Sequence, residues 1–251
     1  MRYAVLADIH GNLEALTAVT DAMTADGVER YLCLGDVVGY GASPTACLER
    51  LRACRAVIVA GNHDAACIGR LQLSWFNETA KASLRWTRDQ LSVLDLDEIR
   101  RWPLTATVEP FTMAHASLRD PGRFEYVVDV AQAVDTLTAC RTLLCLIGHT
   151  HVPCVVEYER DERRLVRMLT GIELLAEVPY DDNQRARRYL INPGSVGQPR
   201  DGDPRASLAV VDTAARTMTV RRIPYDVAGA QQRIRQAGLP NVLADRLALG
   251  R

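Results

Sequence analysis

The first part of the chain alternates short apolar runs with segments whose apolar residues recur at helical spacing. The apolar runs cover residues 2–7, 30–34 and 56–60, and their length and polar boundaries are typical of buried strands. Between them, residues 12–25 and a segment that opens near Pro44 predict helices. This βαβα order predicts parallel strands joined by right-handed crossovers.

The middle of the chain predicts further helices and strands. Residues 74–99 have the spacing of a helix, with Trp75 and Trp86 as core anchors on its apolar face and stacking platforms as the alternative. The later elements are two adjacent strands, a short helix and another strand, at 103–108, 111–115, 129–139 and 143–147.

Beyond residue 151 the pattern changes to β, and a helical tail follows. Short runs separated by turn residues predict strands at 152–159, 165–169, 188–191, 207–212 and 217–223. Two stretches at 160–167 and 185–188 interleave arginine with acidic residues. We interpret them as solvated hairpin tips, with phosphate contact as the alternative. Residues 226–249 predict one or two helices on the outside.

Histidines stand at the ends of the predicted strands. The chain has five of them, and each closes or directly follows an apolar run: His10, His63, His115, His149 and His151. Asp8 and Asp36 share this placement. Ligands of parallel sheets gather at the carboxyl ends of the strands, and carboxylate and imidazole groups together suit a first-row divalent metal. For the first cluster alone, the alternative is that Asp8 caps the next helix and His10 is a loop residue.

These clusters resemble the motifs of the calcineurin-like metallophosphoesterases. The matching segments are Asp8-Ile9-His10, Gly35-Asp36, Gly61-Asn62-His63-Asp64, His115 and Gly148-His149-Thr150-His151, in that order within residues 1–210. A glycine-rich turn at residues 192–197 is similar to that of the small prokaryotic phosphodiesterase branch.

The resemblance implies an α/β (α+β) fold of four layers, an αββα sandwich. Two mixed β-sheets would face each other, with helices outside. We expect one sheet from each half of the chain. We also expect a single metallophosphoesterase domain over residues 1–251, with 226–251 as a C-terminal helical extension.

The resemblance further implies two divalent transition-metal ions as cofactors. Manganese is the first expectation, and iron, zinc, nickel or cobalt are alternatives, because these ligand types admit all of them. The first ion corresponds to Asp8, His10, Asp36 and His151, and the second to Asp36, Asn62, His115 and His149. Asp36 would therefore bridge the two ions.

Catalytic roles follow from the same resemblance. His63 is not needed as a ligand, and it corresponds to the general acid beside the leaving oxygen, oriented by Asp64. Metals at such a site lower the pKa of a bridging water, so that hydroxide attacks phosphorus directly. The resemblance implies no covalent phosphoenzyme.

Two further residues are candidates for binding substrate. Phosphoprotein phosphatases of the superfamily carry an arginine shortly after the second aspartate, and the segment after Asp36 has none. Arg200, after the glycine-rich turn, would bind a substrate phosphate bidentately. Alternatively, the turn is structural and Arg200 pairs with Asp201 or Asp203. Asn12 is the second candidate substrate contact.

Composition narrows the partners and the location. A formal net charge of −1 argues against an extended nucleic-acid footprint or an anionic membrane. No apolar run approaches the length of a membrane span, and the N-terminus lacks the pattern of a signal peptide. The seven cysteines form no Cys-x-x-Cys pair, which is typical of buried thiols in a reducing compartment. We therefore expect a cytoplasmic protein with a small phosphorylated substrate, and the sequence predicts no oligomeric state.

The functional hypothesis is a binuclear metal-dependent phosphoesterase that acts on a small phosphodiester or nucleotide-like substrate. An asymmetric dinucleoside polyphosphate hydrolase is the alternative among enzymes. A non-catalytic scaffold of the same fold, as in the retromer subunit, is the alternative from another class. That subunit lacks the equivalent of His63, and its presence here favours an enzyme.

Overall fold

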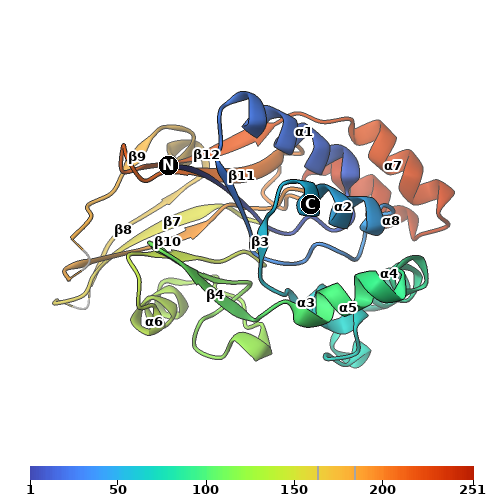
Figure 1. Ribbon diagram of the computed structural model, residues 1–251, viewed down its shortest axis with the longest axis horizontal. Coiled ribbons are helices and arrows are strands. Elements are labelled where there is room, and N and C mark those ends of the chain that lie inside the picture. Colours follow the sequence, from blue (N-terminus) through green and yellow to red (C-terminus); the bar gives the residue numbers. More distant parts are fainter. Residues whose placement is uncertain (163, 184) are drawn as a thin grey trace.

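Two mixed β-sheets pack face to face, with helices on their outer surfaces (Figure 1). The structure is a computed structural model that describes residues 1–162, 164–183 and 185–251. The strands of the first sheet are β1 (Arg2–Leu6), β2 (Arg30–Cys33), β3 (Val57–Ile58), β9 (Val178–Pro179), β11 (Ala206–Asp212) and β12 (Thr217–Ile223). Those of the second are β4 (Thr105–Val108), β5 (Phe111–Ala114), β6 (Leu144–Leu146), β7 (Cys154–Glu159), β8 (Arg164–Thr170) and β10 (Arg187–Asn192).

The helices lie mostly between strands of the first half and at the C-terminus. They are α1 (Leu13–Ala25), α2 (Pro44–Ala53), α3 (Asn62–Cys67), α4 (Glu78–Gln90), α5 (Val93–Arg101), α6 (Val130–Ala139), α7 (Val227–Gln236) and α8 (Asn241–Asp245). Short 3-10 turns cover Leu73–Trp75, Pro121–Arg123, Gly171–Leu175 and Arg246–Leu249.

Successive side chains of a strand point to opposite faces of its sheet, and this alternation produces the four layers. Ala4 and Leu6 of β1 pack with apolar side chains of α1 and α2, whereas Tyr3 and Val5 pack into the space between the two sheets. The Tyr3 ring lies 4.8 Å from that of Phe111 on the second sheet. Helix α6 covers the outer face of the second sheet. The αββα sandwich expected from the resemblance is confirmed.

The expected division of the sheets between the two halves of the chain is wrong. Strand β1 pairs in parallel with β2 but antiparallel with β11, so the first sheet contains strands from both ends of the chain. The second sheet likewise pairs β6 with both β5 and β10 in parallel. Apolar patterning decides which face of a strand is buried, but it does not name the neighbouring strand.

Each sheet contains three neighbouring parallel strands: β1, β2 and β3 in one, and β5, β6 and β10 in the other. Asp8, Asp36 and Asn62 follow the first three, and His115 and His149 follow β5 and β6. The carboxyl ends of parallel strands meet at one edge of a sheet. The fold therefore brings both sets of loops to the same end of the sandwich.

The helix expected over 74–99 is divided into two helices. Helix α4 ends before Leu91, and Ser92 begins α5 by exchanging hydrogen bonds with Asp95 in a capping box. Trp86 is partly buried against the C-terminal helices, but Trp75 is 63% exposed. The prediction that Trp75 anchors the core is wrong, because the 3-10 turn that carries it precedes α4 and lies outside its buried face.

The C-terminal helices pack on the outside of the sandwich, as predicted (Figure 1). Asp226 caps α7 through a hydrogen bond from the Gly229 N–H group. Ile234 and Leu243 of α7 and α8 share an apolar cluster with Tyr40 from the loop after β2. The C-terminal extension is thus connected to a loop that carries predicted site residues.

The hairpin of β7 and β8 carries the first arginine stretch. Arg164 pairs with Glu159 and Arg167 with Glu157, as expected for solvated strands. Positions 163 and 184, within or beside the two stretches, lie outside the described residues. Arg188 departs from the expectation, because it is only 4% exposed and its guanidinium donates to backbone carbonyls.

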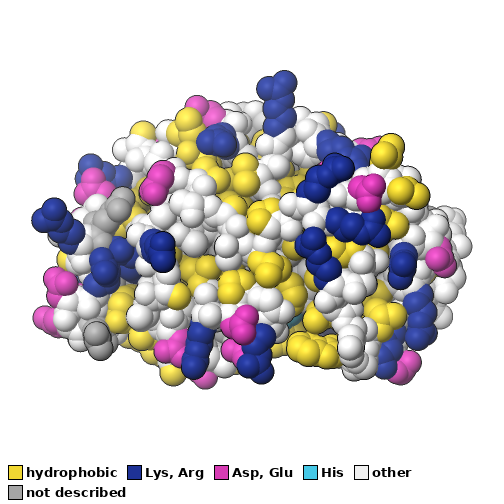
Figure 2. Space-filling view, turned by 60° about the horizontal axis from the view of Figure 1, so that its bottom comes forward, with side chains coloured by type: hydrophobic (Ala, Val, Ile, Leu, Met, Phe, Trp, Pro, Cys, Tyr) yellow, Lys and Arg dark blue, Asp and Glu magenta, His cyan; other side chains and the backbone are white. Residues whose placement is uncertain are grey.

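Three observations bear on the composition-based expectations. All seven cysteines are free thiols in the structure. No described helix is both long enough and apolar enough to span a bilayer. On the face shown in Figure 2, acidic side chains (magenta) lie among the basic ones (dark blue).

Candidate metal centre

Five of the seven predicted metal ligands have a left-handed backbone. The φ angles of Asp8, His10, Asp36, His149 and His151 are 53°, 49°, 51°, 70° and 60°. For residues with a Cβ atom this region costs roughly 1–2 kcal/mol each, and such strain persists where the surrounding structure holds it, often at functional sites. The fold therefore holds these loops in costly conformations that bring their side chains together.

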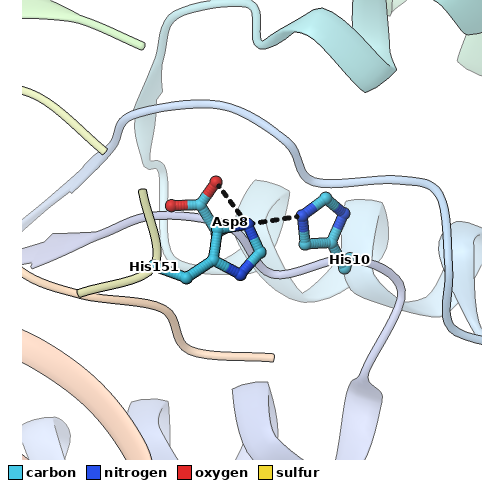
Figure 3. A group of neighbouring side chains, drawn as sticks. All are labelled: Asp8, His10 and His151. Atoms are coloured by element: carbon cyan, nitrogen blue, oxygen red, sulfur yellow. Dashed lines mark hydrogen bonds and ion pairs between the residues drawn. The ribbon is translucent and has the colours of Figure 1, made fainter. Parts of the chain in front are cut away.

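One group of ligands joins the two sheets. Asp8 and His10 follow β1, and His151 follows β6 (Figure 3). His151 Nε2 lies 3.3 Å from Asp8 Oδ1 and 3.2 Å from His10 Nε2. All three side chains are buried, and their donor atoms lie within 4.8 Å of one another. Three of the four residues of the first predicted ligand set therefore lie together.

A second group forms around His115. Its Nε2 atom lies 3.0 Å from Asn62 Oδ1 and 3.0 Å from His149 Nδ1. It also lies 3.4 Å from Asp36 Oδ2. The four residues of the second predicted set thus converge from the loops after β2, β3, β5 and β6.

Asp36 connects the two groups through a single oxygen. Its Oδ2 atom lies 3.6 Å from His10 Nε2 on one side and 3.4 Å from His115 Nε2 on the other. The Oδ1 atom accepts a 2.8 Å hydrogen bond from the His63 N–H group. Gly61 allows this arrangement, because a Cβ atom there would collide with Asp36 Oδ1. Asp36 Oδ2 therefore lies between the imidazole nitrogens of the two groups.

Hydrogen bonds to backbone carbonyls decide the protonation of three imidazoles. His10 Nδ1 lies 3.2 Å from Val38 O, His115 Nδ1 2.8 Å from Leu34 O, and His151 Nδ1 2.6 Å from Gln198 O. A carbonyl oxygen only accepts, so each neutral ring carries its proton on Nδ1. The Nε2 lone pairs of His10 and His151 then face each other at 3.2 Å. This arrangement is repulsive alone and fits a cation.

The ionisation of the site without metal supports the same conclusion. Asp8 Oδ1 is buried and has no hydrogen-bond partner among the described residues. Burial raises the pKa of Asp8 to about 7 and lowers that of His149 to about 3. Burial also disfavours the charged form of His115, but the Asp36 carboxylate outweighs it and raises the His115 pKa to about 9. Bound cations would compensate the buried carboxylates and favour unprotonated imidazoles.

Comparison with known proteins identifies the family. The family model of the calcineurin-like phosphoesterase superfamily domain matches residues 1–216. The chain belongs to this superfamily. It is also 35% identical to the uncharacterized protein MJ0912 of Methanocaldococcus jannaschii over 254 aligned positions, which cover 99% of this chain and 98% of that protein.

Solved structures agree with this assignment. The crystal structure of a metallophosphoesterase from Sphaerobacter thermophilus is 38% identical, with a TM-score of 0.84 and full coverage of both chains. The hypothetical protein PH1004 of Pyrococcus horikoshii shares the fold at 19% identity, with a TM-score of 0.77 over 100% of this chain and 98% of that one. The chain is thus a phosphoesterase of the calcineurin-like type, a hydrolase of a metal-dependent family.

Within this phosphoesterase, His63 and Asp64 have different surroundings. The His63 ring lies 4.8 Å from that of His10 and 4.4 Å from that of Tyr40, and its buried Nδ1 has no partner among the described residues. Asp64 accepts hydrogen bonds from the backbone N–H groups of Asp36, Val37, Val38 and Gly61. The predicted orientation of His63 by Asp64 is therefore wrong. Among the described residues, the Asp64 side chain accepts hydrogen bonds only from the loops that hold Asp36.

Arg200 is directed toward the metal-ligand groups. Its Nη2 atom donates to Gln198 Oε1 at 2.9 Å, its Nε has no partner among the described residues, and its guanidinium lies 6.0 Å from the Tyr40 ring. Its charge lowers the pKa of His151, second to burial. The structural alternative is wrong, because the nearby aspartates pair with other arginines: Asp201 with Arg222, and Asp203 with Arg205 and Arg222.

Asn12 has a structural role in the fold. Its Oδ1 atom accepts from the Ala15 N–H group at 3.1 Å and so caps α1. Its Nδ2 group donates to Gly197 O at 2.8 Å and to Tyr225 Oη at 3.3 Å. These bonds connect β1, the glycine-rich turn and the C-terminal segment. The substrate contact expected of Asn12 is therefore not favoured by its geometry.

Three contributors to the site were missed in the sequence. Gln198 holds both His151, through its carbonyl, and Arg200, through its side chain. Tyr40 lies against His63 and His10, and Tyr126 stacks on His149 with ring centroids 3.9 Å apart. Tyr40 stands between two glycines in the loop after Asp36, which was a usable signal, whereas nothing in the sequence around Tyr126 indicates the site.

Proposed function

We propose that this phosphoesterase uses two divalent transition-metal ions, manganese first among them, to hydrolyse a small phosphodiester or nucleotide-like substrate. The observation that carries the proposal is the position of Asp36 Oδ2, between the nitrogen ligands of two separate groups. The residues named above would hold the ions as two sets that share Asp36. Metals so bound supply Lewis-acid polarisation of the phosphoryl oxygens and a water of lowered pKa.

Arg200 supplies the positive charge for substrate. Its position near His151 and Tyr40, with one nitrogen held by Gln198, leaves the rest of the guanidinium able to donate to a phosphate. Holding Nη2 in place also reduces the entropy lost when the phosphate binds. Arg200 therefore orients the phosphoryl group and adds no ligand to the metals.

His63 donates a proton to the leaving oxygen. In the free protein, burial together with the charges of Arg200 and His115 lowers the pKa of His63 to about 4, against the opposing effect of Asp36. The negative charge of a bound phosphate reverses part of this shift, because an adjacent opposite charge favours imidazolium. His63 lines the cavity beside the metal-ligand residues, so its imidazole can reach a leaving oxygen held there.

Turnover with and without metal tests the proposal. Purified protein stripped with EDTA should be inactive and should regain activity with Mn²⁺ on phosphodiesters, in a panel that also contains monoesters and dinucleoside polyphosphates. Metal at 100 times its dissociation constant should stabilise the fold by about 2.7 kcal/mol per site. That gain corresponds to an increase in Tm of roughly 5–11 °C for a chain of this size.

The panel also decides between substrate classes. Preferred cleavage of dinucleoside polyphosphates would replace the phosphodiester assignment with the alternative hydrolase. The absence of turnover on every substrate, in protein that binds two ions per chain, would refute the catalytic proposal.

A further inference from the structure

A cavity of about 220 Å³ opens beside the metal-ligand residues. Asn62 and His149, two of the proposed ligands, line it together with the neighbouring His63. Tyr40 and Leu71 line it as well, and the rest of the lining comes from two segments: residues 75–80, where α4 begins, and residues 123–126 after β5. Both segments lie at the lower edge of Figure 1. The volume equals that of about seven liquid waters at ~30 Å³ each, which exceeds the need of a phosphate group.

Aromatic rings form the walls of this cavity. Phe76 lies edge-on to the His63 ring with centroids 5.1 Å apart, and Tyr40 lies 4.4 Å from the same ring. On the other side, Tyr126 stacks nearly parallel on His149, with an interplanar angle of 17°. The cavity is therefore lined by the proposed proton donor and by the aromatic side chains that contact His63 and His149.

Two of these rings are left open to solvent. Trp75 is 63% exposed and Tyr126 is 48% exposed. Neither ring is needed to cover the core, since Trp75 belongs to no apolar cluster of the described residues and Tyr126 contacts the ligand His149. Figure 2 turns the lower side forward, and hydrophobic side chains (yellow) gather along the middle and lower part of that face. Exposed ring faces beside a reactive centre indicate a stacking partner.

Polar groups stand at the same cavity. Asn77 uses its Oδ1 atom to cap α4 through the Ala80 N–H group. Its Nδ2 group has no acceptor among the described residues, so it remains available as a donor. Arg123 lines the cavity as well, and its only described ion pair is an exposed contact with Glu125 at 3.4 Å. An alkyl group would use none of these donors, whereas a heteroaromatic ring presents acceptors on its edge and two faces for stacking.

We propose that this cavity binds the nucleobase of a nucleoside esterified to the reacting phosphate. The inference rests on the proposed phosphoesterase function and specifies its substrate class. The base stacks between the exposed rings of Trp75 and Tyr126, and its ribose oxygen lies toward His63. Selectivity for nucleotides over simple alkyl phosphates then comes from the cavity, and the metal-ligand residues do not contribute to it.

Binding of two product analogues to the Mn²⁺-loaded protein tests the proposal. Adenosine 5′-monophosphate and ribose 5-phosphate share the sugar phosphate and differ in the base. Calorimetry should show that the nucleotide binds at least tenfold more tightly. Trp75→Ala should weaken binding of the nucleotide by roughly 5- to 150-fold, which corresponds to ~1–3 kcal/mol per stacked base. It should leave the affinity for ribose 5-phosphate unchanged.

Two variants serve as controls. Trp75→Phe retains a ring and should restore most of the nucleotide affinity. Ile172→Ala removes an apolar side chain that is 83% exposed and does not line the cavity, so it should affect neither ligand. Equal affinity of the wild-type protein for both ligands would overturn the proposal. Equal weakening of both by Trp75→Ala would also overturn it, because the residue would then support the phosphate site as a whole.

Activity on bis(p-nitrophenyl) phosphate distinguishes a failure of the proposed base site from a failure of the proposed phosphoesterase activity. Turnover of this diester with no preference for the nucleotide in the binding experiment would overturn only the base site. The absence of turnover on any phosphoester would refute the enzymatic proposal by itself, whereas the calorimetric comparison would still test the base site.

Discussion

Replacing Asp64 by asparagine should destabilise the loops that hold the metal centre without removing the side chain of any proposed ligand. The carboxylate is fully buried, and its Oδ2 atom accepts from the N–H groups of Asp36 at 2.8 Å and Gly61 at 2.9 Å. The Oδ1 atom accepts from Val37 at 3.0 Å and Val38 at 3.2 Å. One side chain thus fixes the loops after β2 and β3, which carry Asp36 and the residues that surround it.

The magnitude follows from the number of bonds that asparagine cannot make. One amide oxygen can retain two of the four hydrogen bonds, but the NH₂ group then faces two N–H donors. Hydrogen bonds to charged groups contribute ~1.5–3 kcal/mol each. Losing two should lower the free energy of unfolding by about 3–6 kcal/mol, a large share of the ~5–15 kcal/mol that stabilises a typical protein.

Urea unfolding of the metal-free protein, followed by tryptophan fluorescence, measures this loss. Metal content after dialysis against Mn²⁺ should fall below two ions per chain, because the Asp36 loop is no longer held. Asp97→Asn is the matched control, since that carboxylate is half-exposed and pairs only with Arg100 among the described residues. We expect it to change stability by less than about 0.5 kcal/mol.

An opposite pattern would refute the structural reasoning. If Asp64→Asn kept wild-type stability and bound two ions but lost activity, Asp64 would act on the reaction itself. The role that the sequence suggested, orientation of His63, would then be restored.

Three further substitutions test the roles assigned at the site. Asp36→Asn should reduce occupancy of both metal positions in elemental analysis, and two ions bound at wild-type affinity would contradict the bridge. Arg200→Ala should raise KM about 10- to 150-fold with metal content unchanged, as expected for the loss of ~1.5–3 kcal/mol of charged hydrogen bonds. Arg205→Ala is the control, because Arg205 lies in the same loop but pairs with Asp203. An unchanged KM for Arg200→Ala would exclude Arg200 from the substrate site. His63→Ala should slow nucleoside esters by ~10²–10⁴-fold and nitrophenyl esters much less, because nitrophenolate leaves without a proton. Equal losses on both esters, measured where chemistry limits the rate, would exclude a general acid at this position.

Several features of the fold were predictable from the sequence. The helix that begins at Pro44, the hairpin around Glu109 and Pro110, and the C-terminal helices all lie where local pattern places them. These features depend on contacts within a short segment, so the local sequence determines them. The pairing of β1 with β11 depends on residues about 200 positions apart (Val5 with Ala209), and no periodicity in either strand specifies that partner.

The site shows the same division. Its ligand types and their positions at strand ends were visible in the sequence, because parallel strands place their carboxyl ends together. The resemblance to the calcineurin-like metallophosphoesterases implied that Asp36 and His63 belong to one centre. The sequence did not determine the partners of the residues beside them. Asp64 bonds the backbone N–H group of Asp36, and Asp201, next to Arg200, pairs with Arg222.

The tertiary structure decided those roles, because it sets the direction in which each side chain points and the sequence pattern does not. The left-handed backbone at Asp8, Asp36 and His149 aims the side chains inward, and distant segments are needed to hold it. The carboxylate of Asp64 could accept hydrogen bonds from a histidine ring or from a loop. In the fold, three consecutive backbone N–H groups approach it, so it binds the loop. The sequence determines which chemical groups are available to the site. The partner of each polar group is decided only when the two sheets pack together, because a buried donor or acceptor is stabilised by whatever bonding group the fold brings near it.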